Sequence, residues 1–358
     1  MTGLTNSSTR PLGYPDFDVQ RVEVNPVRQC PVKNCSARLT ELIYGRQYDN
    51  KGEPHKRIKL WCPEHRIRLH SGTFVYWNCD RDQGDARLRN FIVHPELVEE
   101  IALKPGAKAE SHRLGYEMSE DALSWNVFVC LAVAGKLRSA AEHLTERRLS
   151  SEPSLYLWGK RIDISGDERE TYEPLVKARE TLEDGIRRFG TEPDIMLVIE
   201  GEMVICIEAK FGSGNPLAYD ATPKDGEKPR SRSELIARYL GCSKKARDCI
   251  RADLMAPTLH SQLFRNVVFA AEMAEADWHV VNLVSKTQLK EEDHPRYSFA
   301  DPTNDVQSYL NSDSQKCFTY RTWERLYESV IQGVPELVAL ASYMRDKSAQ
   351  YTRAFELT

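Results

Sequence analysis

The stretch EPDIMLVIEGEMVICIEAKFGSG, residues Glu192–Gly214, decides the fold of this chain. It holds two apolar runs, Ile195–Ile199 and Met203–Ile207, separated by Glu200-Gly201-Glu202. Continuous apolar runs of this length are typical of strands covered on both faces, and a short turn containing glycine joins antiparallel strands. The stretch therefore predicts a buried β-hairpin.

Three charged residues, Asp194, Glu208 and Lys210, lie at the open end of this predicted hairpin. If Glu200 opposes Glu202 in a three-residue loop, Asp194 lies opposite Glu208, with the two Cβ atoms about 4.5–5.5 Å apart. Side chains alternate along a strand, so Asp194, Glu208 and Lys210 are expected to share one face. A two-residue loop would shift this register by one position.

Two carboxylates at this distance repel each other unless a proton or a cation joins them. Mg²⁺ or Mn²⁺ can join them, because these hard cations favour carboxylate, carbonyl and water oxygens. A bound ion of this kind lowers the pKa of a water ligand and stabilises charge on a phosphate, while Lys210 can position the water. The residues therefore predict phosphodiester hydrolysis. The alternative is a surface hairpin whose ion pair contributes only ~0–1 kcal/mol.

Length and composition describe a folded protein with a substantial core. The chain has 358 residues, of which 41% are hydrophobic and 28% charged, and its formal net charge is −4. This balance argues against intrinsic disorder and against indiscriminate binding of polyanions. No apolar run approaches the ~20 residues that span a bilayer, and no secretory signal begins the chain. We expect a cytoplasmic protein without a membrane segment.

Composition changes along the chain divide it into three parts. Residues 1–20 resemble a flexible tail, and residues 21–110 form a strand-rich module broken by Pro and Gly. The linker-like segment Lys104–Ser111 separates this module from a larger domain, residues 111–358. Within the module, Thr73–Trp77 predicts a strand, while Arg38–Tyr44 fits either a strand or a helical turn.

The larger domain alternates helical and strand patterns. Ser119 precedes an apolar stripe that ends at Gly135, which predicts a capped helix. Helices flanking a short mixed sheet define an α/β fold. Three tryptophans, Trp125, Trp158 and Trp323, are expected to be core aromatics. The further expected elements are helices at Thr171–Arg188, Ser233–Arg251 and Thr258–Glu275 and a strand at His279–Val284.

A pair of short cysteine motifs in the first module predicts a zinc site. Cys30 and Cys35 are separated by four residues, Cys62 and His65 by two, and 26 residues lie between the pairs. Tetrahedral zinc takes four such ligands, and four protein ligands leave no open position, so the Zn²⁺ would be structural. The alternative is that the thiols are buried as small apolar groups. The fourth zinc ligand could instead be His55, His70 or Cys79.

Pro193-Asp194 followed by Glu208-Ala209-Lys210 resembles the motif of the PD-(D/E)XK, or restriction-endonuclease-like, nuclease superfamily. The resemblance covers roughly Ser119–Val330 and implies an αβββαβ core, here preceded by a small zinc-ribbon-like module. Members related to exonucleases carry Gln and Tyr on the next helix, where this chain has Glu234, Arg238 and Tyr239. This departure favours an endonuclease.

The resemblance also implies roles for individual residues. Asp194 and Glu208 would bind the catalytic metal, the carbonyl of Ala209 would add a ligand, and Lys210 would assist the attacking water. Glu120, at the start of the first core helix, would supply a further carboxylate. A second explanation for Glu120 is that the helix dipole favours an acidic residue in the first turn.

Two locally basic stretches, Lys51–His70 and Lys228–Arg251, predict contacts to nucleic acid. The first carries six Lys and Arg against two acids, and the second eight against two. The alternative is that they are solvated faces. The residues expected to bind nucleic acid are Lys59, Arg66, Arg68, Arg230, Arg232, Arg238, Lys244 and Lys245.

These features together predict a metal-dependent DNA endonuclease in which the zinc module recognises or positions the substrate, and the family resemblance implies a role in bacterial defence or in mobile elements. Cutting both strands of a duplex takes two active sites, so a homodimer is expected. Two alternatives remain open at this stage: a nucleic-acid-binding or scaffold protein that keeps the nuclease fold without turnover, and a nuclease that acts on RNA.

Overall fold

The computed structural model describes residues 29–32, 34–48, 54–70, 73–77, 86–102, 114–164, 166, 170–186, 190–219, 230–251, 258–286, 296–347, 355 and 357. The chain divides into two compact units. One contains the described residues up to Asn126 together with Ala339–Phe355, and the other contains Val127–Val338. The predicted tail and the predicted domain boundary at residue 111 lie outside the described residues.

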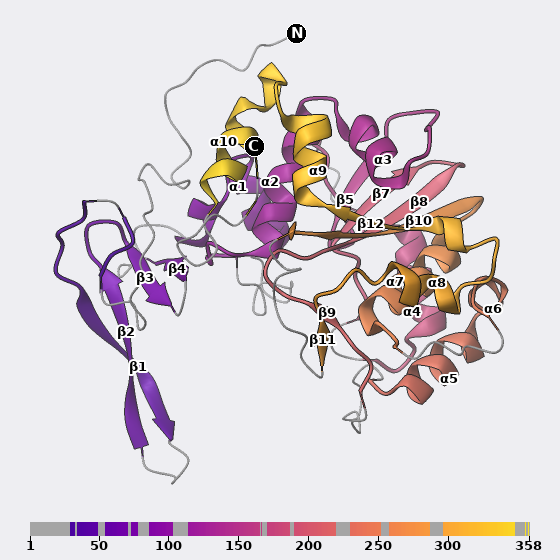
Figure 1. The fold of residues 1–358 in the computed structure, drawn as a ribbon, viewed down its shortest axis with the longest axis horizontal. Helices are drawn as coiled ribbons and strands as arrows, with labels where there is room; N and C mark the ends of the chain where they lie inside the picture. The colour runs from indigo at the N-terminus through magenta and orange to yellow at the C-terminus, as the bar shows by residue number, and fades with distance from the viewer. Residues whose placement is uncertain are drawn as a thin grey trace. The chain divides into compact units, whose positions relative to one another are not determined.

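The first unit contains a four-stranded antiparallel sheet in the order β1-β2-β3-β4 (Figure 1). Of the residues predicted to be strand or helical turn, Thr40–Tyr44 belong to β1, and Thr40–Ile43 pair with Ile58–Trp61 of β2. Cys62 is the last residue of β2, and His65 lies in the turn between β2 and β3. The strands are β1 (Thr40–Tyr48), β2 (Pro54–Cys62), β3 (Ile67–His70) and β4 (Thr73–Tyr76).

Short helices complete the first unit, and a buried lysine connects them. Lys347 donates to Asn90 Oδ1 at 3.2 Å and to the carbonyl of Glu117. The Asn90 amide in turn donates to two backbone carbonyls, so these segments are held together by hydrogen bonds. The helices are η2 (Ala86–Asn90), α1 (Pro95–Ala102), the first half of α2 (Glu120–Val133) and α10 (Val338–Asp346).

The second unit is an α/β fold built on a six-stranded mixed sheet, as the sequence predicts. The strand order is β12-β10-β8-β7-β5-β6. Strands β5, β7 and β8 are antiparallel neighbours, whereas β8, β10 and β12 run parallel. The strands are β5 (Ser154–Leu157), β6 (Lys160–Arg161), β7 (Ile195–Ile199), β8 (Met203–Ala209), β10 (Asp277–Val284) and β12 (Phe318–Thr322), with a separate ladder of β9 (Asn215–Pro216) and β11 (Tyr297–Ser298).

Helices flank both faces of this sheet (Figure 1). On one face lie α3 (Leu137–Thr145) and α9 (Trp323–Leu326), and on the other α4 (Glu173–Leu182), α5 (Arg232–Cys242), α6 (Lys244–Cys249), α7 (Ser261–Met273) and α8 (Thr303–Tyr309). Short turns are η5 (Gln315–Cys317), the π-helix η6 (Tyr327–Ile331) and η7 (Pro335–Leu337). The helix predicted at 233–251 is two helices, because Ser243 is extended and its side chain caps α6. Among the described residues, no helix has the length and apolar character that a membrane crossing requires.

The hairpin of β7 and β8 has the predicted register. Ile195 pairs with Ile207 and Ile199 with Met203, which leaves a three-residue loop. Gly201 in that loop has a φ of 67°, a conformation that glycine adopts without steric cost. The hairpin is buried on both faces, as its continuous apolar runs predict.

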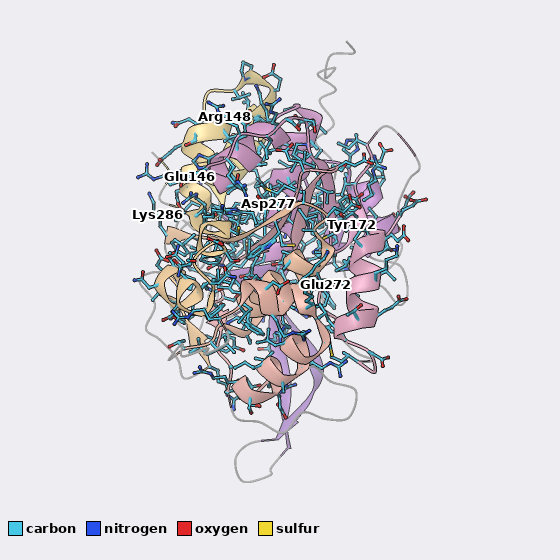
Figure 2. All side chains as sticks on the ribbon, turned by 90° about the vertical axis from the view of Figure 1, so that its right-hand side faces the viewer. Glu146, Arg148, Tyr172, Glu272, Asp277 and Lys286 are labelled. Atoms are coloured by element: carbon cyan, nitrogen blue, oxygen red, sulfur yellow. The ribbon has the colours of Figure 1, made fainter. Side chains whose placement is uncertain are left out.

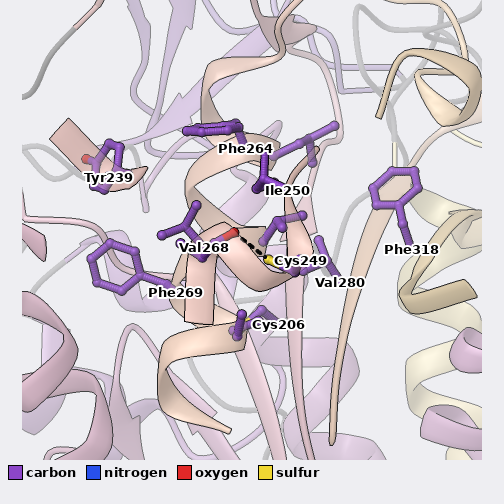
Figure 3. Packing of buried hydrophobic residues seen from close by; sticks show 14 of the residues in the cluster. Cys206, Tyr239, Cys249, Ile250, Phe264, Val268, Phe269, Val280 and Phe318 are labelled. Atoms are coloured by element: carbon purple, nitrogen blue, oxygen red, sulfur yellow. Dashed lines mark hydrogen bonds between the residues drawn. The ribbon is translucent and has the colours of Figure 1, made fainter. Parts of the chain in front are cut away.

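The core beneath the sheet fixes which hairpin residues share a face. Cys206 of β8 lies in one buried cluster with Phe264 and Val268 of α7 and Val280 of β10 (Figure 3). Met196 of β7, which pairs with Cys206, belongs to the same cluster. The face of the hairpin that carries these two side chains is therefore the one covered by α7.

Candidate active site and candidate metal centre

Asp194, Glu208 and Lys210 lie at one end of the β7–β8 hairpin. Because Ile195 pairs with Ile207, the preceding residue Asp194 lies opposite Glu208. Side chains alternate between the two faces of a strand. Asp194 is two residues from Met196 and Glu208 is two residues from Cys206, so both acidic residues lie on the face covered by α7. The hairpin thus brings the two predicted carboxylate residues to neighbouring positions.

Glu208 and Lys210 form a buried ion pair. Their exposed fractions are 2% and 5%, and Lys210 Nζ lies 2.6 Å from Glu208 Oε1. A buried charge carries a large desolvation cost, which an oppositely charged partner and further hydrogen bonds offset. This pairing explains how charged residues can lie at the end of an apolar hairpin.

Two residues of α7 complete this pair, and the sequence analysis missed both. Lys210 Nζ donates to Gln262 Oε1 at 3.1 Å, and Asn266 Nδ2 donates to Glu208 Oε2 at 2.8 Å. Residues four positions apart lie on the same face of a helix. Two amides at this spacing, in a helix that is otherwise apolar on its buried side, are the signal that could have identified them.

Asp194 is held from the opposite strand. Its Oδ2 accepts a hydrogen bond from the backbone N–H of Ala209 at 3.0 Å, and its carbonyl accepts from Trp158 N at 3.3 Å. The carboxylate is only partly buried, in contrast to that of Glu208. Of the two acidic residues, Asp194 is therefore the more exposed.

The site lies at the carboxyl edge of the parallel part of the sheet. Lys210 N donates to the carbonyl of Leu283 at the end of β10, at 2.8 Å. Asn282 pairs with Glu208 in the parallel register, and its side chain exchanges hydrogen bonds with Asn215 at 2.8 and 3.2 Å. In α/β proteins, ligands bind at this edge of parallel strands. The surrounding amides are buried and hydrogen-bonded, so the edge is rigid and polar.

The donor chemistry of Asp194 and Glu208 suits Mg²⁺ or Mn²⁺, which take carboxylate oxygens. Both oxygens of Glu208 already accept hydrogen bonds from Lys210 and Asn266. Glu120 lies in the first turn of α2, in the other unit, where an acidic residue suits the helix dipole. The catalytic metal and the role of Glu120 stay predictions.

Cys30, Cys35, Cys62 and His65 form a cluster that could hold a metal ion such as zinc. Their ligand atoms all lie within 4.8 Å of one another, and in the described part of the chain this is the only such set of three or more His, Cys, Asp or Glu side chains. The site sits in the first unit, where the core around it includes Phe74. The structure thus brings together all four predicted ligands.

Three of the distances within this cluster match those of a tetrahedron around zinc. Zinc bonds of about 2.3 Å to sulfur and 2.0–2.1 Å to nitrogen require about 3.8 Å between sulfurs and about 3.6 Å between sulfur and nitrogen. Cys35 Sγ and Cys62 Sγ are 3.8 Å apart, and His65 Nδ1 lies 3.6 Å from Cys30 Sγ and 3.5 Å from Cys62 Sγ. Burial and the neighbouring Cys62 raise the pKa of the Cys30 thiol, so a cation is needed to hold it as a thiolate.

Arg89 fixes the turn that carries His65. Its guanidinium donates to the carbonyls of His65 and Arg66, at 3.1 and 2.9 Å. The same guanidinium lies over the ring of Tyr76, 4.9 Å from the centroid. Arg66 has a φ of 51°, in the left-handed region. Arg89 therefore holds a strained turn in the shape that presents His65 to the cysteines. The competitor Cys79 and the side chains of His55 and His70 lie outside what the structure describes.

Several of the predicted nucleic-acid residues make contacts within the chain. Arg238 donates to the carbonyls of Leu182 and Asp184, Arg230 Nη1 donates to the Tyr219 hydroxyl at 3.1 Å, and Arg68 is 8% exposed beside Trp77. Lys245 Nζ donates to the carbonyl of Glu272, which is labelled in Figure 2. The exposed or half-buried residues include Lys59, Arg66, Arg230, Arg232, Lys244 and Lys245. These residues have the accessible charge that contact with a phosphate backbone requires.

No family model, no curated protein and no solved structure matches this chain. The functional assignment therefore depends on the geometry of the two sites.

Proposed function

We propose that this chain is a metal-dependent nuclease of the PD-(D/E)XK superfamily, a DNA endonuclease that hydrolyses phosphodiester bonds. The observation that carries the proposal is the buried pair of Glu208 and Lys210, with its 2.6 Å contact, placed opposite Asp194 at the open end of a hairpin. An acid and a lysine two residues apart, beside a second acid on the facing strand, form the arrangement that phosphodiester hydrolysis needs.

The topology supports this proposal. The order α2, β5, β7, β8, α7, β10 is compatible with the αβββαβ order expected of the restriction-endonuclease-like core, once the intervening α3, β6, α4, β9, α5 and α6 are set aside as additions. In the sheet, β5, β7 and β8 form an antiparallel meander, and α7 connects β8 to the parallel strand β10. The candidate residues come from the ends of β8 and the start of β7, and α7 supplies the amides behind them.

Each residue has a role that its contacts define. Asp194 and Glu208, with the carbonyl of Ala209, would hold Mg²⁺ or Mn²⁺, which supplies Lewis-acid stabilisation and an activated water when bound. Asn266 fixes the orientation of the Glu208 carboxylate. Gln262 accepts from Lys210 and so directs the ammonium toward the site, where it can position water or neutralise the scissile phosphate.

The zinc module would bind the substrate. A structural Zn²⁺ in the cluster would hold the turn around Arg66 rigid and present its exposed charge to the DNA backbone. We further propose that the protein acts in the cytoplasm as a homodimer, since cutting both strands requires two sites, and that it serves bacterial defence or a mobile element. These points rest on the resemblance of the motif.

A second function is favoured by one observation. Both oxygens of Glu208 accept hydrogen bonds from within the chain, which a nucleic-acid-binding protein without turnover would need in order to keep a buried acid. In that case the nuclease fold would serve as a scaffold. The same experiment separates the two functions.

The test incubates purified protein with supercoiled plasmid, linear duplex, single-stranded DNA and RNA, each with Mg²⁺, Mn²⁺ or EDTA. Metal-dependent cleavage that is lost in Asp194→Ala and Lys210→Ala supports the nuclease, and the preferred substrate decides between DNA and RNA. Lys177→Ala, which removes an exposed lysine from the surface of α4, is the matched control and should cut normally. Binding without cleavage would establish the scaffold function instead.

A further inference from the structure

The segment that follows β12 reaches the candidate active site with two consecutive residues. Trp323 is fully buried, and its Nε1 donates to the carbonyl of Lys210 at 3.0 Å. The N–H of Lys210 donates to the carbonyl of Leu283. Both backbone groups of Lys210 are therefore hydrogen-bonded to other elements, the N–H to the end of β10 and the carbonyl to the start of α9.

Glu324 makes the equivalent contact to the neighbouring strand end. It is fully buried, and its two carboxylate oxygens each lie 3.2 Å from the backbone N–H of Lys286, just beyond β10. Ser285 Oγ lies 3.4 Å from the same carboxylate. A buried carboxylate is costly, and hydrogen bonds from a charged group to backbone N–H groups are among the stronger ones. Glu324 therefore holds the chain where it leaves β10.

The parallel arrangement explains why one short segment can reach both places. The carboxyl ends of β8, β10 and β12 meet at one edge of the sheet, and α9 begins directly after β12. The indole of Trp323 is itself held by the ring of Phe128, at 6.3 Å in an edge-to-face arrangement. The start of α9 is thus a rigid element against which the other two strand ends are fixed.

We propose that Trp323 and Glu324 are positioning residues that fix the backbone of Lys210 and the end of β10, so that the Lys210 ammonium keeps its place beside Glu208. The proposal rests on the proposed nuclease function. A backbone shift at Lys210 would carry its Nζ away from Glu208 and from the position where it acts on water. A displacement of about 1 Å in a reacting group can lower the rate by about a hundredfold.

The test removes the indole N–H while it keeps an aromatic ring, in Trp323→Phe. The expected results are faster amide hydrogen exchange in the peptide that contains Lys210 and a kcat on DNA about 10–100-fold lower at nearly unchanged KM. Glu324→Ala should speed exchange at Ser285 and Lys286. The control is Trp125→Phe, which removes an equivalent bond, from Trp125 Nε1 to the carbonyl of Val93 at 2.9 Å in the other unit.

Exchange at Lys210 and kcat that stay at wild-type values in Trp323→Phe would overturn the proposal. Equal losses of kcat in Trp323→Phe and Trp125→Phe would also overturn it, because they would show a general effect of stability. If the wild-type protein cleaves no nucleic acid, the proposed nuclease function fails. The exchange measurements then still decide whether Trp323 and Glu324 fix the two strand ends, since they need no catalysis.

Discussion

Lys210 and Glu208 form an ion pair of 2.6 Å inside the protein, at the carboxyl end of β8, which is otherwise apolar. Both side chains point to the face covered by α7, where Gln262 and Asn266 complete their hydrogen bonds. The pair is therefore part of the core as well as of the candidate active site, and its removal has consequences for both stability and activity.

Lys210→Met should lower the free energy of unfolding by about 3–5 kcal/mol, because it leaves the Glu208 charge buried without its partner. Urea denaturation measures this change. The control is Lys177→Met, whose lysine pairs with Glu173 on the surface and whose loss should cost less than about 1 kcal/mol. Similar losses in the two variants would show that the buried pair has no special energetic role.

The purified protein should contain one Zn²⁺ per chain, measured by elemental analysis. Cys62→Ser removes one of the four ligands and should lower the zinc content to well below one per chain, with loss of the charge-transfer absorption of the Co²⁺-substituted form. Cys242→Ser removes an exposed thiol in α5 and should leave the zinc content unchanged. A protein that is folded and zinc-free without chelators would contradict the site.

Arg89 and Arg66 should have opposite roles in the zinc module. Arg89→Ala removes the guanidinium hydrogen bonds to the carbonyls of His65 and Arg66, and it should weaken zinc binding about tenfold or more, as outer-shell changes do. Arg66→Ala removes an exposed charge and should leave zinc binding unchanged while it weakens DNA binding. Zinc transfer to a chromogenic chelator measures zinc affinity, and a DNA-binding titration measures DNA affinity. If the same variant were the more impaired in both assays, the two arginines would not have the separate roles predicted here.

Lys244 and Arg238 both lie in the basic stretch Lys228–Arg251, but their substitutions should have different effects on DNA binding. Lys244 is exposed, so Lys244→Ala should weaken DNA binding and reduce the slope of log K against log salt by about 1. Arg238 instead holds the end of α4 through its bond to the carbonyl of Leu182 at 2.8 Å. Arg238→Ala should therefore lower the thermal midpoint and leave the salt slope unchanged. A reduced salt slope in Arg238→Ala would assign that guanidinium to DNA.

Stability should rise with pH above about 8 because of Lys347. Burial lowers the pKa of Lys347 to about 8, from 10.5 for an unperturbed lysine, although the Glu117 carboxylate opposes this effect. Between these values the unfolded chain binds more protons, so the free energy of unfolding increases with pH, by at most roughly 3 kcal/mol. Below about pH 8 both states are protonated and this contribution is constant. Urea midpoints from pH 7 to 10 measure the rise, which should be absent in Lys347→Met.

The sequence predicted the local parts of the structure well. The hairpin register follows from the length of the apolar runs and from Gly201, so Asp194 and Glu208 could be placed opposite each other in advance. The grouping of Cys30, Cys35, Cys62 and His65, a cluster that could hold a metal ion, follows from the spacing of two short motifs. In both cases the information lies within a few neighbouring residues.

Contacts between distant segments could not be predicted in this way. Gln262 and Asn266 follow Lys210 by more than fifty positions, and Trp323 lies still further along the chain, so no spacing rule connects them. The helix predicted at 233–251 is divided into α5 and α6 by a local effect, because Ser243 caps α6 and interrupts a helical pattern that would otherwise continue. The use of Arg238 to hold α4 is likewise invisible until the two helices are placed together.

The first unit is assembled from both ends of the described chain, since Ala339–Phe355 belongs to it and Lys347 bonds to Asn90 within it. During synthesis by the ribosome, Ala339–Phe355 emerge only after Val127–Val338 of the second unit. The early segments must therefore wait for their final partner while the later unit has already had time to fold. A protein cut short before Lys347 would retain a complete six-stranded sheet and leave its cysteine-bearing unit unfinished.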